Sequence, residues 1–254
     1  MAGVGAVCGL IVAVVIFAPA AWLAAALAVA SATQVQLLDP QGSVWRGDAQ
    51  LVLSGGVGST DALALPGRVA WELDPVLHGL RLRLRAGCCT PAPLETTLVP
   101  AWSGVTLVVA DAVSHWPAGL LAGLGAPWNT LQAQGQLDLR SEGLSVEWTE
   151  GRIRLVGSAQ LEALGVSSSL STLKPLGSYR LLLAGSTGQG APVLQLQTLE
   201  GSLSLGGSGQ WNGARWSFRG EASATPQDEP VLGNLLNMVG RRQGARSLIA
   251  LGQG

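Results

Sequence analysis

Apolar and polar residues alternate with a period of two through most of the sequence, and this pattern restricts the chain to β-structure. In "LRLRLRAG" (residues 80–87), the leucines would lie on one face of a strand and the arginines on the other. Runs of about 4–8 residues with this pattern, bounded by Gly, Pro, Asn or Ser, are typical of half-buried strands. Because short turns separate the runs, we expect antiparallel hairpins and not parallel strands joined by helices.

The runs predict about ten to twelve strands in a mainly β fold. The expected order is an N-terminal transmembrane helix, then a curved antiparallel sheet, a half-barrel or taco-like meander, with a short C-terminal helix. Many of the 35 glycines lie inside the runs, where they favour bends and bulges. No fixed repeat length emerges, which argues against a propeller or a solenoid.

Two hairpins are predicted from turn residues. "GQLDLR" and "LSVEW" would pair around Ser141–Gly143, and Leu199–Ala224 would form a second hairpin with a Gly/Asn turn. The inner face of the second hairpin is predicted to carry Leu203, Leu205, Trp216 and Phe218, and its outer face Glu200, Arg215, Arg219 and Glu221.

Helical patterns are few. Asp111–Pro127 predicts one or two short helical turns, since its glycines disfavour a long helix. From Asp228 to Arg242 the signals for a helix are stronger, with acidic residues and a proline at the start and arginines at the end. Its apolar face would consist of Leu232, Leu235, Leu236 and Val239. A last strand, Ala245–Leu251, would close the sheet or cover its edge.

The N-terminus predicts a membrane anchor. No charged residue occurs from Ala2 to Leu38, and Gly9–Ala30 is long enough to span a bilayer at about 1.5 Å per residue, with a kink at Pro19. The alternative is a secretory signal cleaved after Ala32, but the apolar run is longer than usual for signals and no basic residue precedes it. We therefore divide the chain into an anchor or signal-like segment, residues 1–32, and a β-rich domain, residues 33–254. The large anchor residues are Leu10, Ile11, Val14, Ile16, Phe17, Trp22, Leu23 and Leu27.

Recognisable reactive chemistry is absent from the sequence. The two histidines, His78 and His115, read as turn or packing residues, and Ser54–Asp61 lacks the lysine of a phosphate-binding loop. Charged residues make up 12% of the chain and the net charge is −1, so nothing indicates nucleic acid as a partner. We assign no catalytic, cofactor-binding or metal-binding residue and expect no small-molecule substrate.

Adjacent cysteines, Cys88 and Cys89, form the most unusual pair in the sequence; the third cysteine, Cys8, lies in the anchor. We favour two small residues at the end of a strand. In an exported compartment they could instead form a vicinal disulfide, which is strained, or cross-link to a partner. With no C-x-x-C spacing, zinc is not indicated.

A row of arginines, Arg81, Arg83 and Arg85, would lie on one strand face at intervals of about 6.6–7 Å. It is a candidate surface for an anionic partner, although a solvated strand face that discourages edge pairing explains it as well. The tryptophans on apolar faces, Trp71, Trp148 and Trp216, are predicted in the core. Trp45 would pack at the end of the sheet.

Several strings, taken in order, resemble the type II secretion system protein N family, the N component of the general secretion pathway. They are "GSVWRGDAQLVL" (42–53), "LPGRVAWEL" (65–73), "STLKPLGSYRL" (171–181), "LEGSLSLGGSGQW" (199–211) and "NLLNMVGRRQGARSLIALG" (234–252). The resemblance implies a single-pass inner-membrane protein of Gram-negative bacteria with its β-rich domain in the periplasm. It also implies a non-enzymatic accessory role in exporting folded proteins across the outer membrane, alongside other type II secretion components and inner-membrane lipids. The family has no catalytic residues to transfer.

Two other function classes remain open at this stage. A curved sheet with one apolar face could hold acyl chains, as a lipid-binding or lipid-transfer module. An envelope hydrolase would instead require polar groups that converge in one pocket. A scaffold would need neither, since partners can add a strand at an open sheet edge.

Overall fold

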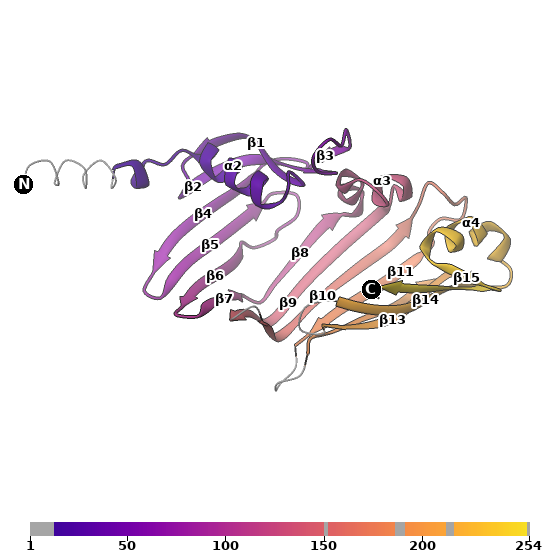
Figure 1. The fold of residues 1–254 in the computed structure, drawn as a ribbon. Coiled ribbons are helices and arrows are strands. Elements are labelled where there is room, and N and C mark those ends of the chain that lie inside the picture. The colour runs from indigo at the N-terminus through magenta and orange to yellow at the C-terminus, as the bar shows by residue number, and fades with distance from the viewer. Residues whose placement is uncertain (1–12, 150–151, 186–190, 212–215, 253–254) are drawn as a thin grey trace, which may run out of the picture.

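The computed structural model describes residues 13–149, 152–185, 191–211 and 216–252, and their strands form a single open antiparallel sheet (Figure 1). The hydrogen-bonded order is β1-β2-β4-β5-β6-β7-β9-β10-β11-β12-β13-β14-β16-β15; β3 pairs with β2, and β8 with β9. The strands are β1 (Val35–Gly42), β2 (Arg46–Ser54), β3 (Ala62–Ala64), β4 (Val69–Val76), β5 (Gly79–Ala86), β6 (Leu94–Ala101), β7 (Gly104–Val109), β8 (Ala112–Pro117), β9 (Gln134–Thr149), β10 (Arg152–Ser167), β11 (Gly177–Ala184), β12 (Val193–Gly201), β13 (Leu203–Trp211), β14 (Trp216–Ala224), β15 (Arg241–Gln243) and β16 (Arg246–Leu251). The helical segments are α2 (Ala20–Ala30), η1 (Ala118–Leu124), α3 (Trp128–Leu131) and α4 (Glu229–Val239).

The open antiparallel meander confirms the predicted fold class, with more strands than expected. Figure 1 shows the sheet twisting along its length, so that β4 and β13 lie at clearly different inclinations. Such twist is the usual result of the right-handed preference of each strand. The sheet does not close, and β1 and β15 are its two edges.

The predicted turn at Ser141–Gly143 is wrong. β9 runs through it as one 16-residue strand that pairs with β10 along almost its full length. Its other side is shared by two short strands, β8 and β7. Gly143 has a positive φ of 55° and stands beside the register shift between Val156 and Ser158. The glycine that suggested a turn therefore belongs to an irregularity inside a long strand.

The predicted short helix over Asp111–Pro127 is half right. Residues 118–124 form the 3-10 helix η1, but residues 112–117 form strand β8 against the first half of β9.

The hairpin over Leu199–Ala224 is confirmed for β13 and β14, which pair from Leu203↔Ala224 to Trp211↔Trp216. Leu199 belongs to the preceding strand β12, which ends at Gly201. Leu203 and Phe218 are buried as predicted; the side chain of Trp216, and Arg215, lie outside the described residues.

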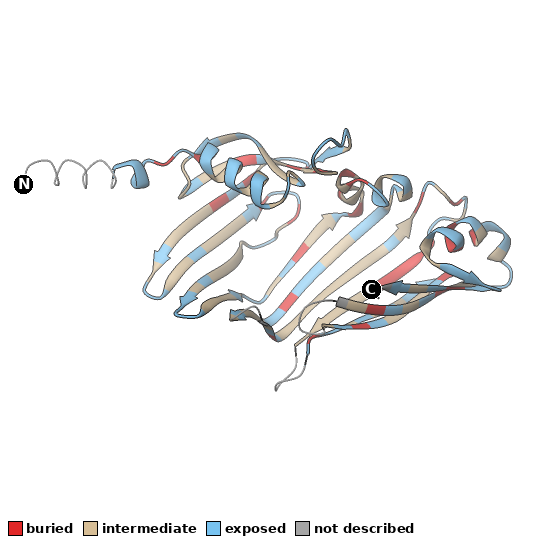
Figure 2. Cartoon of the chain, in the orientation of Figure 1, coloured by how far each residue is buried: buried red, intermediate tan, exposed pale blue. Residues whose placement is uncertain are grey.

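Among the described residues, three small apolar clusters take the place of one central core, and each lies beneath a helical segment on the same side of the sheet. Ala20 of α2 packs with Ala49 and Trp71. Leu120 of η1 lies in a second cluster with neighbouring strand residues. The third cluster holds Leu232, Leu235 and Leu236 of α4 against Leu176, Leu203 and Ala222, which confirms the predicted helix face. Figure 2 shows that most strand positions are only partly buried, as expected of a single-layer sheet.

The predicted membrane-spanning helix over Gly9–Ala30, with its kink at Pro19, is not found where the structure describes this segment. Backbone helicity at residues 13–16 stops before Pro19, which instead bridges to Ser43, and α2 starts again at Ala20. α2 then packs on the sheet because Ala20 fits against Ala49 and Trp71. Within the described residues, no helix has both the length and the apolar character needed to cross a membrane. Leu10 and Ile11 lie outside those residues, and the domain division at residue 32 stays a prediction.

Candidate functional site

The face of the sheet that carries the helices, here called the inner face, is lined by continuous rows of apolar side chains. Strand register places these side chains opposite one another on neighbouring strands. One row crosses β5, β6, β7, β9 and β10 through Leu80, Leu98, Leu107, Val146 and Leu155. A second row crosses β9 to β12 through Leu139, Leu161, Leu181 and Leu196.

A pocket of about 380 Å³ lies beneath α2 at one end of the inner face. Leu23 and Leu27 of α2 form one wall of this N-terminal pocket, and Trp71, Leu82 and Leu84 line it from the sheet. Leu23 and Leu27 were predicted to be anchor residues, but the structure places them in this pocket. Trp71 is buried, as predicted.

A second pocket of about 290 Å³ lies further along the inner face. This C-terminal pocket is bounded by helical residues that include Leu121, Trp128 and Leu235, while Leu161, Leu181 and Leu196 of the second row line it from the sheet. Neither pocket exposes a polar atom among the described residues. Sequence reasoning did not identify either pocket, because only strand register shows which leucines share a row.

Part of the inner face that lines neither pocket is exposed. Leu98, Leu139 and Trp148 all point from this face and are exposed, and Trp148 retains 58% of its accessible surface. The prediction that Trp148 lies in the core is therefore wrong. Trp148 stands near the end of β9 opposite the helices, where no described element covers it. Exposed apolar side chains that gather on one face of a protein can mark a binding surface, so the inner face is the candidate site.

The outer face carries charged side chains in cross-strand pairs. Arg83 donates a hydrogen bond to Asp74 and lies 3.1 Å from Glu72. The hydrogen bond from Arg83 lowers the pKa of Asp74, and the hydrogen bond to Asp74 raises the pKa of Arg83. The predicted arginine row is thus neutralised at its centre. Arg81 and Arg85 are exposed on either side and remain the candidate contacts for an anionic partner.

His115 is the one histidine engaged in a side-chain pair in the described structure. Its Nδ1 lies 2.7 Å from Asp138 Oδ1, which also accepts a hydrogen bond from the Gln136 amide. Burial opposes ionisation of Asp138, but the hydrogen bonds from His115 and Gln136 outweigh it and lower its pKa. No described hydroxyl or thiol hydrogen-bonds to His115, so the pair lacks the nucleophile that acyl-transfer chemistry requires. Among the described residues, no group of three or more His, Cys, Asp or Glu side chains is placed to hold a metal ion.

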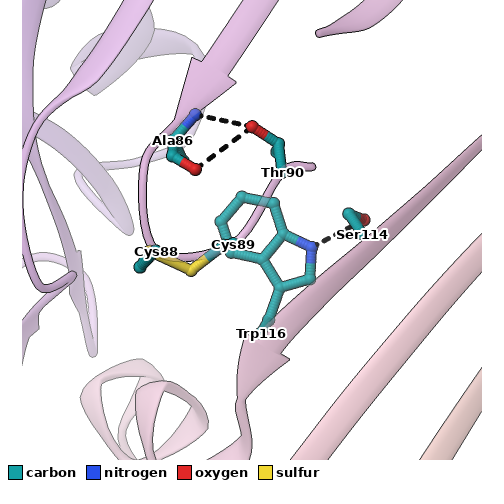
Figure 3. The surroundings of a disulfide bond; sticks show 6 residues. All are labelled: Ala86, Cys88, Cys89, Thr90, Ser114 and Trp116. Atoms are coloured by element: carbon teal, nitrogen blue, oxygen red, sulfur yellow. Dashed lines mark hydrogen bonds between the residues drawn. A yellow bond between two sulfur atoms is a disulfide. The ribbon is translucent and has the colours of Figure 1, made fainter. Parts of the chain in front are cut away.

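The adjacent cysteines form a vicinal disulfide in the turn after β5 (Figure 3). Our preferred expectation of two unlinked small residues is therefore wrong. Cys89 is buried within the cluster beneath η1, beside Trp116, whereas Cys88 is exposed. The Thr90 hydroxyl oxygen lies within hydrogen-bond distance of both the Ala86 amide nitrogen and the Ala86 carbonyl oxygen, which closes the turn.

Three turns at one end of the strands, residues 43–45, 77–78 and 102–103, form what we call the hairpin rim. The chain reaches the sheet at this rim, where the Val44 amide bonds to the Ala18 carbonyl oxygen. Leu77 and Trp102 at the neighbouring turns are almost fully exposed. In the described segment before Pro19, Val14, Ile16 and Phe17 are exposed as well. Exposed apolar side chains therefore occur both in the N-terminal segment and at two turns of the hairpin rim.

A family model for type II secretion system (T2SS), protein N matches residues 33–248. The chain belongs to this family. The match spans nearly the full sheet, from before β1 into β16, and confirms the resemblance found in the sequence. No curated protein and no solved structure matches the chain at a significant level. The matched family is a component of the type II secretion system. Membership therefore associates the chain with the other components of that system.

Proposed function

We propose that this member of the T2SS protein N family is a non-catalytic accessory subunit that assists the export of folded proteins across the outer membrane. The family match carries this proposal, because it covers residues 33–248 and thus the sheet that forms most of the molecule. The described surfaces fit a connector, since they offer apolar and charged faces and two open sheet edges but no converging reactive groups.

The proposal includes attachment to the inner membrane by the charge-free residues before Ala18. Residues 2–17 carry no charge, and a bilayer can thin to match an apolar segment shorter than the roughly 30 Å of its core. Attachment there would bring the hairpin rim to the membrane surface. Exposed Trp102 and Leu77 suit that position, because tryptophan favours the headgroup region.

The proposal also places the sheet in the periplasm. The disulfide between Cys88 and Cys89 supports an oxidising compartment, since disulfides persist in the periplasm and are rare in the cytosol.

Contacts with other secretion components are proposed at the open edges of the sheet. β1 pairs on one side only, with β2, so its other side has backbone groups available to an added strand. Asp39, with a φ of 48°, and the following Pro40 interrupt β1. The Val35 amide and carbonyl oxygen already hydrogen-bond to the Ser31 hydroxyl, so Gln36–Leu38, before this interruption, is the favoured docking edge.

A pull-down of the full chain from membranes tests the proposed function. We expect other type II secretion components to co-purify with the full chain. The control is a chimera in which residues 1–32 are kept and residues 33–254 are replaced by an unrelated exported domain. Equal recovery of secretion components with both baits, or no recovery with either, would refute the proposal.

A further inference from the structure

We propose that the inner face binds the acyl chains of membrane lipids, with the two apolar pockets holding the chains. This activity goes beyond an accessory role in secretion. It rests on the membrane attachment proposed above only for the source of the lipid.

The length of the inner face fits this ligand. The first leucine row crosses four strand spacings, from β5 to β10, or about 19 Å, and the second crosses three, from β9 to β12, or about 14 Å. One acyl chain covers half of a bilayer core, about 15 Å. Each row therefore has about the length of one chain. The pockets, at about 380 and 290 Å³, are of the size that small ligands occupy, roughly 300–1,000 Å³.

The chemistry of the lining separates an acyl chain from a peptide. The pockets offer no exposed polar atom among the described residues, so each backbone group of an extended peptide would give up its hydrogen bonds to water on entry and find no partner in the pocket. A helical peptide makes its backbone hydrogen bonds internally, but its diameter of about 10–12 Å is too large for a pocket that already has Leu23 and Leu27 of α2 as one wall. An acyl chain has no polar group to satisfy and is narrow enough to enter.

A second copy of the chain is also a poor occupant. Two sheets that pack face to face lie about 10 Å apart. α2, η1 and α4 stand on the inner face and would hold a second sheet further away. The exposed inner-face residues Leu98, Leu139 and Trp148 would then remain uncovered.

The position of α2 links the N-terminal pocket to the membrane. α2 forms one wall of that pocket, and the charge-free residues 2–17 precede it in the chain. With those residues in the bilayer, the pocket lies beside the point where lipid is available. This continuity favours a membrane lipid over a soluble apolar ligand.

Site-specific photo-cross-linking in the full, membrane-embedded chain tests the proposal. Leu181 and Leu182 are adjacent in β11 but lie on opposite faces, because Leu181 pairs with Leu161 and Leu182 with Gln160. We would compare Leu181→p-benzoylphenylalanine with the matched control Leu182→p-benzoylphenylalanine. On irradiation, we expect phospholipid adducts by mass spectrometry at position 181 and not at 182. A second pair, Leu98 and Thr97, provides the same comparison at an exposed position that tolerates substitution.

The outcomes are distinct. Adducts with a second copy, adducts with another polypeptide, or no adduct at 181 and 98 would each overturn the proposal. Equal lipid labelling on both faces would overturn it too. Ala163→Phe adds bulk to the C-terminal pocket and should reduce lipid labelling at 181 about tenfold, equivalent to about 1.4 kcal/mol. Unchanged labelling in a folded Ala163→Phe variant would contradict the proposal. The pull-down detects secretion partners and the cross-linking detects lipid. A failure of the proposed secretion role can therefore be distinguished from a failure of the lipid-binding proposal.

Discussion

Trp45 ties the N-terminal segment to the first turn of the sheet: its indole nitrogen donates a hydrogen bond to the Val15 carbonyl oxygen, 2.8 Å away and thirty residues earlier in the chain. Pro19 adds a bridge to Ser43 in the same turn. Because α2 begins immediately afterwards and packs on the inner face, the direction in which the segment leaves the sheet is set by these contacts.

Loss of the Trp45 contact should loosen the N-terminal segment. Trp45→Phe removes the indole donor but keeps an aromatic ring. A hydrogen bond of this kind contributes about 1 kcal/mol, so amide hydrogen exchange in peptides that cover residues 13–18 should become about fivefold faster. Trp22→Phe is the control, since Trp22 is exposed on α2. The same increase in Trp22→Phe would show that the Trp45 hydrogen bond does not hold the segment.

Tyr179, which lines the C-terminal pocket, should contribute to stability through its hydroxyl group. Its hydroxyl donates a 3.0 Å hydrogen bond to the Leu203 carbonyl oxygen, and burial raises its pKa to about 12. Tyr179→Phe should lower the free energy of unfolding by about 1 kcal/mol in denaturant titrations. Tyr179 is the single tyrosine in the chain, so tyrosinate absorbance follows it alone.

The raised pKa of Tyr179 also predicts how the free energy of unfolding changes at alkaline pH. The folded state disfavours the ionised phenol, so the associated stability is complete below the ordinary pKa of 10.0 and is lost as the pH rises towards about 12. Tyr179→Phe should remove this alkaline loss. A tyrosinate transition near pH 10 in the folded protein would contradict the burial of this hydroxyl.

Asp74 should contribute to stability only where its carboxylate is ionised. The hydrogen bond from Arg83 lowers its pKa below the ordinary 3.8, so its contribution is present above that value and is lost as the pH falls through the lower folded value. Asp74→Asn should therefore reduce stability at neutral pH and flatten the acid limb of the stability curve. Glu142→Gln, at an exposed carboxylate, controls for the loss of one negative charge. An unchanged acid limb in Asp74→Asn would count against the Arg83 pair.

The packing of Cys89 in its apolar cluster should contribute more to the free energy of unfolding than the disulfide bond between Cys88 and Cys89. A disulfide between neighbours closes almost no chain, so it restricts the unfolded state little. Cys88→Ala should therefore leave the free energy of unfolding nearly unchanged. Cys89→Ser places a hydroxyl among Leu65, Val69 and Leu120 and should cost about 1–3 kcal/mol. Equal losses in the two variants, measured by denaturant titration, would assign the stability to the disulfide instead.

Period-two alternation predicted the strands and the face on which Leu203 and Phe218 are buried, because each strand's own pattern encodes its faces. The local sequence predicts less well where one strand ends and the next begins. Gly143 reads as a turn in sequence, yet the continuous partner β10 keeps β9 intact. Likewise, the burial of α2 depends on Ala49 and Trp71, which lie far along the chain.

The candidate site was harder to predict than the fold for the same reason. Leu139, Leu161, Leu181 and Leu196 form one row only because four strands pair in a given register. Their sequence neighbourhoods show no shared motif. Local pattern identifies an apolar face, but long-range pairing decides where that face is covered and where it stays open.

The exposed residues of the hairpin rim should strengthen binding to a lipid surface. Leu77 has 91% of its surface exposed in the turn between β4 and β5, and Trp102 occupies the next turn. Leu77→Ser and Trp102→Ser should each weaken co-sedimentation of the full chain with phosphatidylethanolamine–phosphatidylglycerol vesicles, because each removes an apolar side chain worth about 1.5–3 kcal/mol when fully buried. Val57→Ser is the matched control, since Val57 is 86% exposed in the loop at the opposite end of β2. The same weakening in Val57→Ser would show that apolar exposure in general, and not the hairpin rim, contacts the vesicle.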